Sequence, residues 1–154
     1  MLAPVFYLFV SSAACSQKEP ISSAEVASKF VASLNNKDMG TLSRLSATPL
    51  WVRQQDWASA KDGAGFTLGQ ANDTSLTDVA SIKKYFSDQV KKIAVERETP
   101  NSASLSLLQD ELKGSEKLWE GLAIHLFRRG MGDVEHIFVV GVDGKGKIVA
   151  VYLN

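Results

Sequence analysis

The apolar and polar positions of this chain follow three successive patterns. A continuous apolar run covers residues 2–10. In residues 22–45 and again in residues 75–93, apolar residues recur every three or four positions, which is the spacing of amphipathic helices. After Pro100, β-branched and aromatic residues gather in segments separated by glycine-containing turns, a pattern typical of strands. The chain is therefore predicted to form most of its helices first and most of its sheet afterwards.

Three helices are predicted from the apolar spacing in the first part of the chain. The first begins at Ser22, because Ser22 and Glu25 have the spacing of a capping box, and it ends at the polar residues 35–38. A second, short helix is entered at Asp38, and a third covers residues 75–93. The lysines of the third helix lie opposite its apolar stripe, as expected of a face exposed to solvent.

A sheet is predicted from one early strand and from the segments after residue 100. The early strand covers Leu50 to Gln54. A glycine-rich stretch follows it and is expected to form a long loop, with or without a hairpin. The later segments are separated by short turns, which favours an antiparallel meander. These segments cover residues 102–112, 117–129, 133–143 and 147–154. The expected fold class is α+β, with about three helices packed on one face of a curved, mostly antiparallel sheet.

The helical stripes also predict which side chains form the core. On the helices these are Phe30, Leu34, Ile82 and Phe86. They are expected to pack against a sheet that contains Leu122, Ile124, Val139 and Val149.

Composition favours one domain and excludes one class of partner. The chain has 154 residues, 45% of them hydrophobic, which suits a single compact domain with a core of its own. Basic and acidic residues number 17 each, so the formal net charge is zero, and no cluster of five basic residues occurs. A nucleic-acid partner is therefore not expected.

The start of the chain has the pattern of an export signal. Its apolar run is about as long as the hydrophobic part of a secretory signal, and well short of the roughly 20 residues that span a bilayer as a helix. Small residues follow, and then Cys15, the only cysteine of the chain. This stretch resembles the lipobox of bacterial lipoproteins, in which the cysteine is acylated and becomes the first residue of the mature protein. The alternative is an ordinary cleaved signal in which the thiol occurs by chance.

The lipobox resemblance implies three parts and a location. Residues 1–14 would be the signal peptide, residues 15–21 a lipid-anchored tether, and residues 22–154 the folded domain. Ser16 stands where an aspartate favours retention at the inner membrane of enteric bacteria. The implied location is the bacterial cell envelope, at the outer membrane facing the periplasm, with the membrane as a partner through the lipid.

Residues 22–154 resemble the cone-shaped superfamily of nuclear transport factor two, which includes ketosteroid isomerase and the SnoaL-type cyclases. The resemblance rests on the patterns of residues 26–45, 48–52 and 136–154. It implies a cavity at the wide end of the cone that holds small apolar molecules or is filled by side chains. Many members dimerise through the outer face of the sheet, and a homodimer is expected here because residues 135–142 are apolar on both faces.

Two histidines of the later strands, His125 and His136, are candidate metal ligands. A two-residue turn at Gly130 and Met131 would set His125 directly opposite His136. The same face would hold Trp119, Phe127 and Phe138. Zinc needs three or four protein ligands, which the spacing does not supply, so neither a metal site nor a cofactor is expected.

The candidate ligand-binding residues lie in and after the early strand. Alternation along this strand places Trp51, Arg53 and Gln55 on one face. Trp51 and Arg53 are predicted to form the mouth of a mainly apolar pocket, together with Asp56 and Trp57 at the strand's end and Phe66 in the glycine-rich loop. Asp56 is expected to be exposed, or paired with Arg53, rather than to act as a base.

Two functions from different classes remain open at this point. The first is a noncatalytic, lipid-anchored envelope domain that binds a small apolar ligand or a partner protein. The second is a cyclase or isomerase that works by acid and base catalysis, with Asp56 as a base and Tyr85 or Tyr152 as a proton donor. Since no acid and base pair stands in a recognisable motif, no catalytic residue is assigned and the first function is preferred.

Overall fold

The computed structural model describes residues 21–89, 101–102, 108–109, 111–131 and 134–154. The predicted signal peptide, Cys15 and all but the last residue of the predicted tether lie outside the described residues. The last residues of the predicted third helix and much of the predicted strand at 102–112 lie outside them as well.

The first two predicted helices are present, and their starts follow the capping side chains. Helix α1 covers Ser23–Asn35, and its capping box is confirmed. The backbone N–H of Glu25 donates to Ser22 Oγ at 3.2 Å, and the backbone N–H of Ser22 donates to the Glu25 carboxylate at 3.0 Å. Helix α2 covers Met39–Leu45 and is entered at Asp38, whose carboxylate accepts a backbone N–H of the first turn.

The third helix, α3, covers Val79–Gln89 and begins later than predicted. The Asp78 carboxylate accepts the backbone N–H of Ser81 at 2.8 Å, which satisfies a donor at the start of the helix. The residues before it form strand β4, Asn72–Leu76, so the prediction of helix from residue 75 is wrong. A short helix that was not predicted, α4, covers Glu116–Trp119, where a strand was expected to begin.

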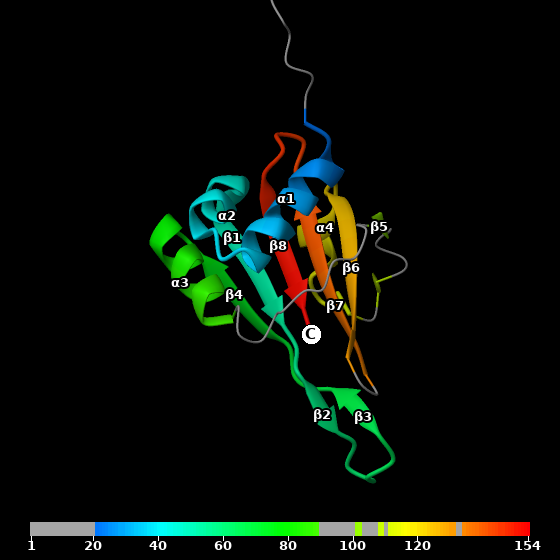
Figure 1. Ribbon diagram of the computed structural model, residues 1–154. Helices are drawn as coiled ribbons and strands as arrows, with labels where there is room; N and C mark the ends of the chain where they lie inside the picture. Colours follow the sequence, from blue (N-terminus) through cyan, green and yellow to red (C-terminus); the bar gives the residue numbers. More distant parts are fainter. Residues whose placement is uncertain (1–20, 90–100, 103–107, 110, 132–133) are drawn as a thin grey trace, which may run out of the picture.

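Strand β4 belongs to a sheet of six strands (Figure 1). The other five are β1, Ser46–Gln54; β5, Asn101–Ser102; β6, Ala123–Met131; β7, Val134–Val142; and β8, Ile148–Leu153. They are ordered β4-β1-β8-β7-β6-β5, and all neighbours are antiparallel except β1 and β8. Two further strands, β2 (Trp57–Ser59) and β3 (Phe66–Leu68), form a separate hairpin that projects beyond the sheet (Figure 1).

Helices α1, α2 and α3 lie on one face of this sheet. Helix α1 packs against β6 and β7, α2 against β1, and α3 against β4 (Figure 1). A register shift between Gly141 and Val142 marks an irregularity of the kind that bends a strand. The fold class is therefore α+β, with a curved, mostly antiparallel sheet, as predicted.

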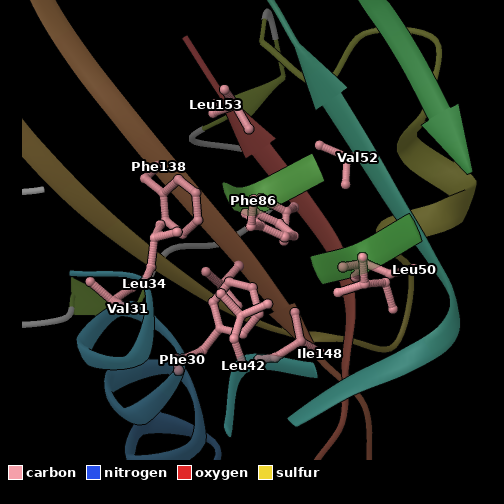
Figure 2. Close-up of a cluster of buried hydrophobic side chains, with 14 of the residues drawn as sticks. Phe30, Val31, Leu34, Leu42, Leu50, Val52, Phe86, Phe138, Ile148 and Leu153 are labelled. Atoms are coloured by element: carbon pink, nitrogen blue, oxygen red, sulfur yellow. The ribbon is translucent and has the colours of Figure 1, made fainter. Parts of the chain in front are cut away.

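An inner core fills the space between the helices and the sheet (Figure 2). Phe30 and Phe86 are fully buried, and their rings meet edge to face with centroids 5.6 Å apart. Phe30 also stacks on Phe138 of β7 at 6.3 Å. Leu34 and Ile82 are buried in the same cluster, so all four predicted helix core residues are confirmed.

A second core, the outer core, lies on the opposite face of the sheet, the outer face. Its buried residues are Leu108, Leu112, Trp119, Ile124, Leu126, Ile137, Val139, Ala150 and Tyr152. Ile124 and Val139 therefore do not face α1, α2 and α3, and that part of the predicted core is wrong. The side chains that do face the helices come from the alternate positions Phe127, Phe138, Val140, Val142 and Val151. Leu122 packs against the second core, while Val149 is half-buried.

The outer core explains why β7 is apolar on both faces. Phe138 and Val140 pack under the helices, whereas Ile137 and Val139 are covered by Leu112 and Trp119 of the same chain. Both covers come from one molecule, so this pattern does not by itself require a second copy.

The predicted pairing of the two histidines is wrong. In the β6–β7 ladder His125 lies opposite Val140, and His136 lies opposite Arg129. His125 Nε2 is 3.1 Å from Ser23 Oγ, whereas His136 Nδ1 is 2.9 Å from the backbone oxygen of Asn154. The two rings therefore have separate partners.

Candidate functional site

Strand β1 presents two different sets of side chains to the two cores. Leu50 and Val52 point to the inner core, while Trp51 is partly buried against the outer core. Arg53 follows at the next outer position, and Gln55 accepts a hydrogen bond there from the hydroxyl of Tyr152 at 3.2 Å. The predicted alternation, with Trp51, Arg53 and Gln55 on one face, is thus confirmed.

Arg53 is a buried cation that is held from two sides. It is 6% exposed, and its guanidinium donates from Nε to Asp73 Oδ1 at 2.8 Å and from Nη2 to Asp73 Oδ2 at 2.9 Å. Asp73 stands directly opposite on β4. A third donor, Nη1, bonds the backbone oxygen of Lys113 at 2.8 Å. Arg53 therefore ties β1 to β4 and to the segment that covers the outer face.

The Arg53 pair fixes the ionisation of both partners. The hydrogen bond from Arg53 lowers the pKa of Asp73, and the same bond raises the pKa of Arg53 against the opposing effect of burial. Asp73 therefore remains a carboxylate at neutral pH, while its side chain is still 46% exposed.

Trp51 is fixed by contacts with two neighbours. The guanidinium carbon of Arg53 lies 5.3 Å from the centroid of the Trp51 ring, a cation–π distance. The ring of Trp119, which is fully buried, meets Trp51 at an interplanar angle of 86° with centroids 6.0 Å apart. A ring held in this way offers a rigid aromatic surface where it remains exposed.

A pocket of about 590 Å³ opens beside Trp51 on the outer face. Its lining residues are Trp51, Asp73, Gly114, Ser115, Glu116, Lys117 and Leu118. One wall is thus the β1–β4 edge of the sheet, and the other is the turn that leads into α4. The lining is mixed, with polar or charged side chains from four residues and apolar surface from Trp51 and Leu118. Of the predicted ligand-binding residues, Trp51 belongs to this lining.

The turn that forms the second wall has a defined shape. Gly114 has φ of +85°, a conformation that favours glycine. Ser115 Oγ donates to the backbone oxygen of Leu112 at 2.7 Å. Backbone N–H groups of Glu116 and Gly114 lower the pKa of the Glu116 carboxyl, so it is ionised at neutral pH. Leu118 adds an apolar side chain that is 37% exposed.

The structure places the other predicted binding residues away from this lining. Asp56 is exposed and accepts a hydrogen bond from Gln54 Nε2 at 3.1 Å, while Arg53 pairs with Asp73 instead. Trp57 begins the projecting hairpin, and Phe66 lies on its second strand with 54% of its surface exposed. A ligand-binding role for these three residues stays a prediction.

The candidate proton donors Tyr85 and Tyr152 lie in different parts of the fold. Tyr85 of α3 donates to Gln54 Oε1 at 3.2 Å, and burial raises its pKa to about 12. Tyr152 lies in the outer core, where burial raises its pKa to about 12 as well. Both hydroxyls therefore stay protonated at neutral pH and are engaged with amide side chains.

Within the described residues, no three His, Cys, Asp or Glu side chains come together as a group that could hold a metal ion. No helix in the described part of the chain is long and apolar enough to cross a membrane.

Sequence reasoning missed Asp73 and residues 114–118. Asp73 belongs to a polar segment without strand alternation, and residues 114–118 have the composition of an ordinary turn. One signal was present: a guanidinium on a half-buried strand needs a carboxylate partner. In an antiparallel ladder this partner comes from the neighbouring strand, which the sequence did not reveal.

Comparisons with known proteins address the fold. No family model matches the sequence, and no curated protein matches it. Among solved structures, an NTF2-like protein of unknown function from Cytophaga hutchinsonii is 11% identical, with a TM-score of 0.43, over 89% of this chain and 92% of that one. An uncharacterised cystatin-fold protein from Novosphingobium aromaticivorans is 9% identical, with a TM-score of 0.44, over 88% and 99%. A computationally designed 17-OHP binder is 14% identical, with a TM-score of 0.45, over 88% and 92%. At these identities the likeness says nothing of a ligand for this chain.

Proposed function

We propose that this chain is a noncatalytic binding domain of the bacterial cell envelope, anchored through a lipid on Cys15, and that its ligand enters the pocket beside Trp51. The observation that carries the binding role is the pocket itself. Its volume of about 590 Å³ lies within the usual range of about 300–1,000 Å³ for small-molecule sites. Its floor is a tryptophan held by Trp119 and Arg53, and its rim carries the Asp73 carboxylate, which Arg53 holds in position.

A binding role fits the acid–base properties of the pocket better than catalysis does. A general acid or base works best when its pKa lies near the working pH. The pKa values of Asp73 and Glu116, the two carboxyls of the lining, are instead lowered. Asp73 is in addition held at both oxygens by Arg53. These groups are suited to accepting hydrogen bonds from a ligand rather than to exchanging protons with it.

Support for the lipid anchor comes from the sequence alone. The apolar run, the small residues after it and the single cysteine support lipid attachment at Cys15. Helix α1, which follows the tether, packs on the inner face of the sheet, while the pocket opens on the outer face. An anchor before α1 would therefore leave the mouth of the pocket free.

The binding role is tested by ligand-observed NMR on the full chain in a detergent without a sugar headgroup. A library of small apolar and polar fragments is screened against the wild type, Trp51→Ala and Trp57→Ala. We expect fragments that bind the wild type and Trp57→Ala but lose binding to Trp51→Ala. Circular dichroism confirms that each variant is folded. Fragments that bind all three proteins alike, or a screen without binders, would overturn the proposed pocket.

A further inference from the structure

We infer that the ligand of the Trp51 pocket is a neutral sugar ring, recognised by stacking on the indole and by hydrogen bonds to the Asp73 carboxylate at the rim. This inference rests on the proposed binding role of the pocket and adds the chemical class of the ligand. A pyranose combines one apolar face of C–H groups with a surrounding edge of hydroxyls. The pocket offers surfaces of both kinds within one cavity.

The aromatic floor matches the C–H face of such a ring. Trp51 is fixed by its contacts with the Trp119 ring and with the guanidinium of Arg53, so little side-chain entropy is lost when a ligand stacks on it. The face of an indole carries partial negative charge, which attracts polarised C–H groups. Leu118 extends the apolar surface on the opposite wall.

Asp73 supplies acceptors for the hydroxyls. A carboxylate has about four lone-pair positions, and Arg53 Nε and Nη2 use one on each oxygen. The side chain is still 46% exposed, so the remaining positions can accept O–H groups. The Arg53 pair keeps the carboxylate in one orientation and so reduces the cost of ordering it on binding.

The charges around the pocket favour a neutral ligand. The buried cation of Arg53 compensates Asp73, and Glu116 is followed by Lys117, so no net charge is left for a charged ligand to neutralise. A wholly apolar ligand fits less well, because Asp73, Ser115, Glu116 and Lys117 place polar or charged side chains in the lining beside Trp51 and Leu118. Covering the polar groups of the rim without giving them hydrogen bonds would cost free energy.

The test is a titration of the full chain, in a detergent without a sugar headgroup, with cellobiose and with N,N′-diacetylchitobiose. Glycerol serves as a polyol without a ring, and 1-anilinonaphthalene-8-sulfonate as an apolar probe. Binding is followed by calorimetry and by saturation-transfer NMR, which identifies the sugar protons in contact with the protein. We expect at least one disaccharide to bind through its C–H face, with affinity reduced about tenfold or more in Trp51→Ala. Trp51→Phe, which keeps a ring, should retain part of the affinity, and Trp57→Ala should retain all of it.

The outcomes separate this inference from the proposed function. If the apolar probe binds in a Trp51-dependent manner and neither disaccharide binds, the sugar inference is overturned while the pocket stands. If disaccharides bind equally well to Trp51→Ala, the inference is overturned because the stacking surface is elsewhere. If no probe of any class depends on Trp51, both the inference and the proposed function are overturned.

Discussion

Arg53 and Asp73 face each other across the β1–β4 ladder and form a two-point ion pair, with Nε–Oδ1 at 2.8 Å and Nη2–Oδ2 at 2.9 Å. The pair is asymmetric, because the arginine side chain is 7% exposed and the aspartate side chain 46% exposed. Arg53 also reaches the backbone of Lys113, so one buried cation joins the sheet edge to the turn that forms the other wall of the pocket.

Replacing Asp73 with alanine is expected to destabilise the fold, because it leaves the buried Arg53 guanidinium without its carboxylate. The expected loss is about 1–3 kcal/mol of unfolding free energy, below that for a fully buried pair because Asp73 is half-exposed. Urea denaturation measures this change. Asp56→Ala is the matched control, since Asp56 is exposed, and it should change stability by less than about 0.5 kcal/mol. Equal effects of the two variants would contradict a structural role for the pair.

Acidification is expected to destabilise the protein through His125. Burial lowers the pKa of His125 below its ordinary value of 6.5 in the folded state. As the pH falls through 6.5, the unfolded chain therefore binds a proton before the folded one does, and stability decreases until the folded pKa is reached. Urea unfolding at about pH 8 and about pH 5.5 measures the loss, and His125→Gln should make it smaller. An unchanged loss in His125→Gln would show that other groups cause it.

Removing the Phe86 ring is expected to weaken the inner core strongly. Phe86 is fully buried and contacts Phe30 edge to face, so Phe86→Ala should cost about 3–5 kcal/mol. Phe66→Ala removes the same group from the projecting hairpin, where it is 54% exposed, and should cost less than about 0.5 kcal/mol. Thermal or urea unfolding of the two variants provides the comparison. Similar losses would contradict the assignment of Phe86 to the core.

Local signals in the sequence were enough to predict the elements that carry them. The capping box of Ser22 and Glu25 gave the start of α1, and strict alternation from Leu50 to Arg53 gave the two faces of β1. Strand β4 was missed because its polar, exposed residues show no alternation; its pairing with β1 depends on the Arg53–Asp73 contact and on backbone bonds. Its place is thus decided by tertiary structure, which a local pattern does not encode.

The register of the β6–β7 ladder could not be obtained from side-chain periodicity. The predicted pair was His125 with His136, whereas the observed partner of His125 is Val140, four residues further along. A shift by an even number of residues keeps every side chain on its face, so the apolar pattern fits both registers equally. The apolar pattern on both faces of β7 was also compatible with two arrangements. Either a second copy of the chain or the chain's own Leu108, Leu112, Trp119 and Leu122 could cover the outer face, and the structure shows the latter.

Lipid attachment at Cys15 predicts a defined product when the full chain is expressed in a bacterial host. The mature protein should begin at Cys15 and should be heavier than its peptide by a diacylglyceryl group and an amide-linked acyl chain. Cys15→Ser should abolish both the processing and the added mass, and mass spectrometry of the purified protein measures them. A mature chain that begins elsewhere, or a free thiol at Cys15, would contradict the anchor.

The three tryptophans report on three separate places, and this allows one measurement to test the pocket directly. Trp51 lines the pocket, Trp57 begins the projecting hairpin, and Trp119 is fully buried in the outer core. Their indole N–H signals can be assigned in a ¹⁵N-labelled full chain by single substitutions. The measurement is a titration with a probe that binds the protein, followed through these three signals. The proposed site predicts that the Trp51 signal shifts with the binding curve while the Trp57 signal stays in place. A shift of Trp57 with Trp51 unchanged would place the binding site on the hairpin and contradict the pocket.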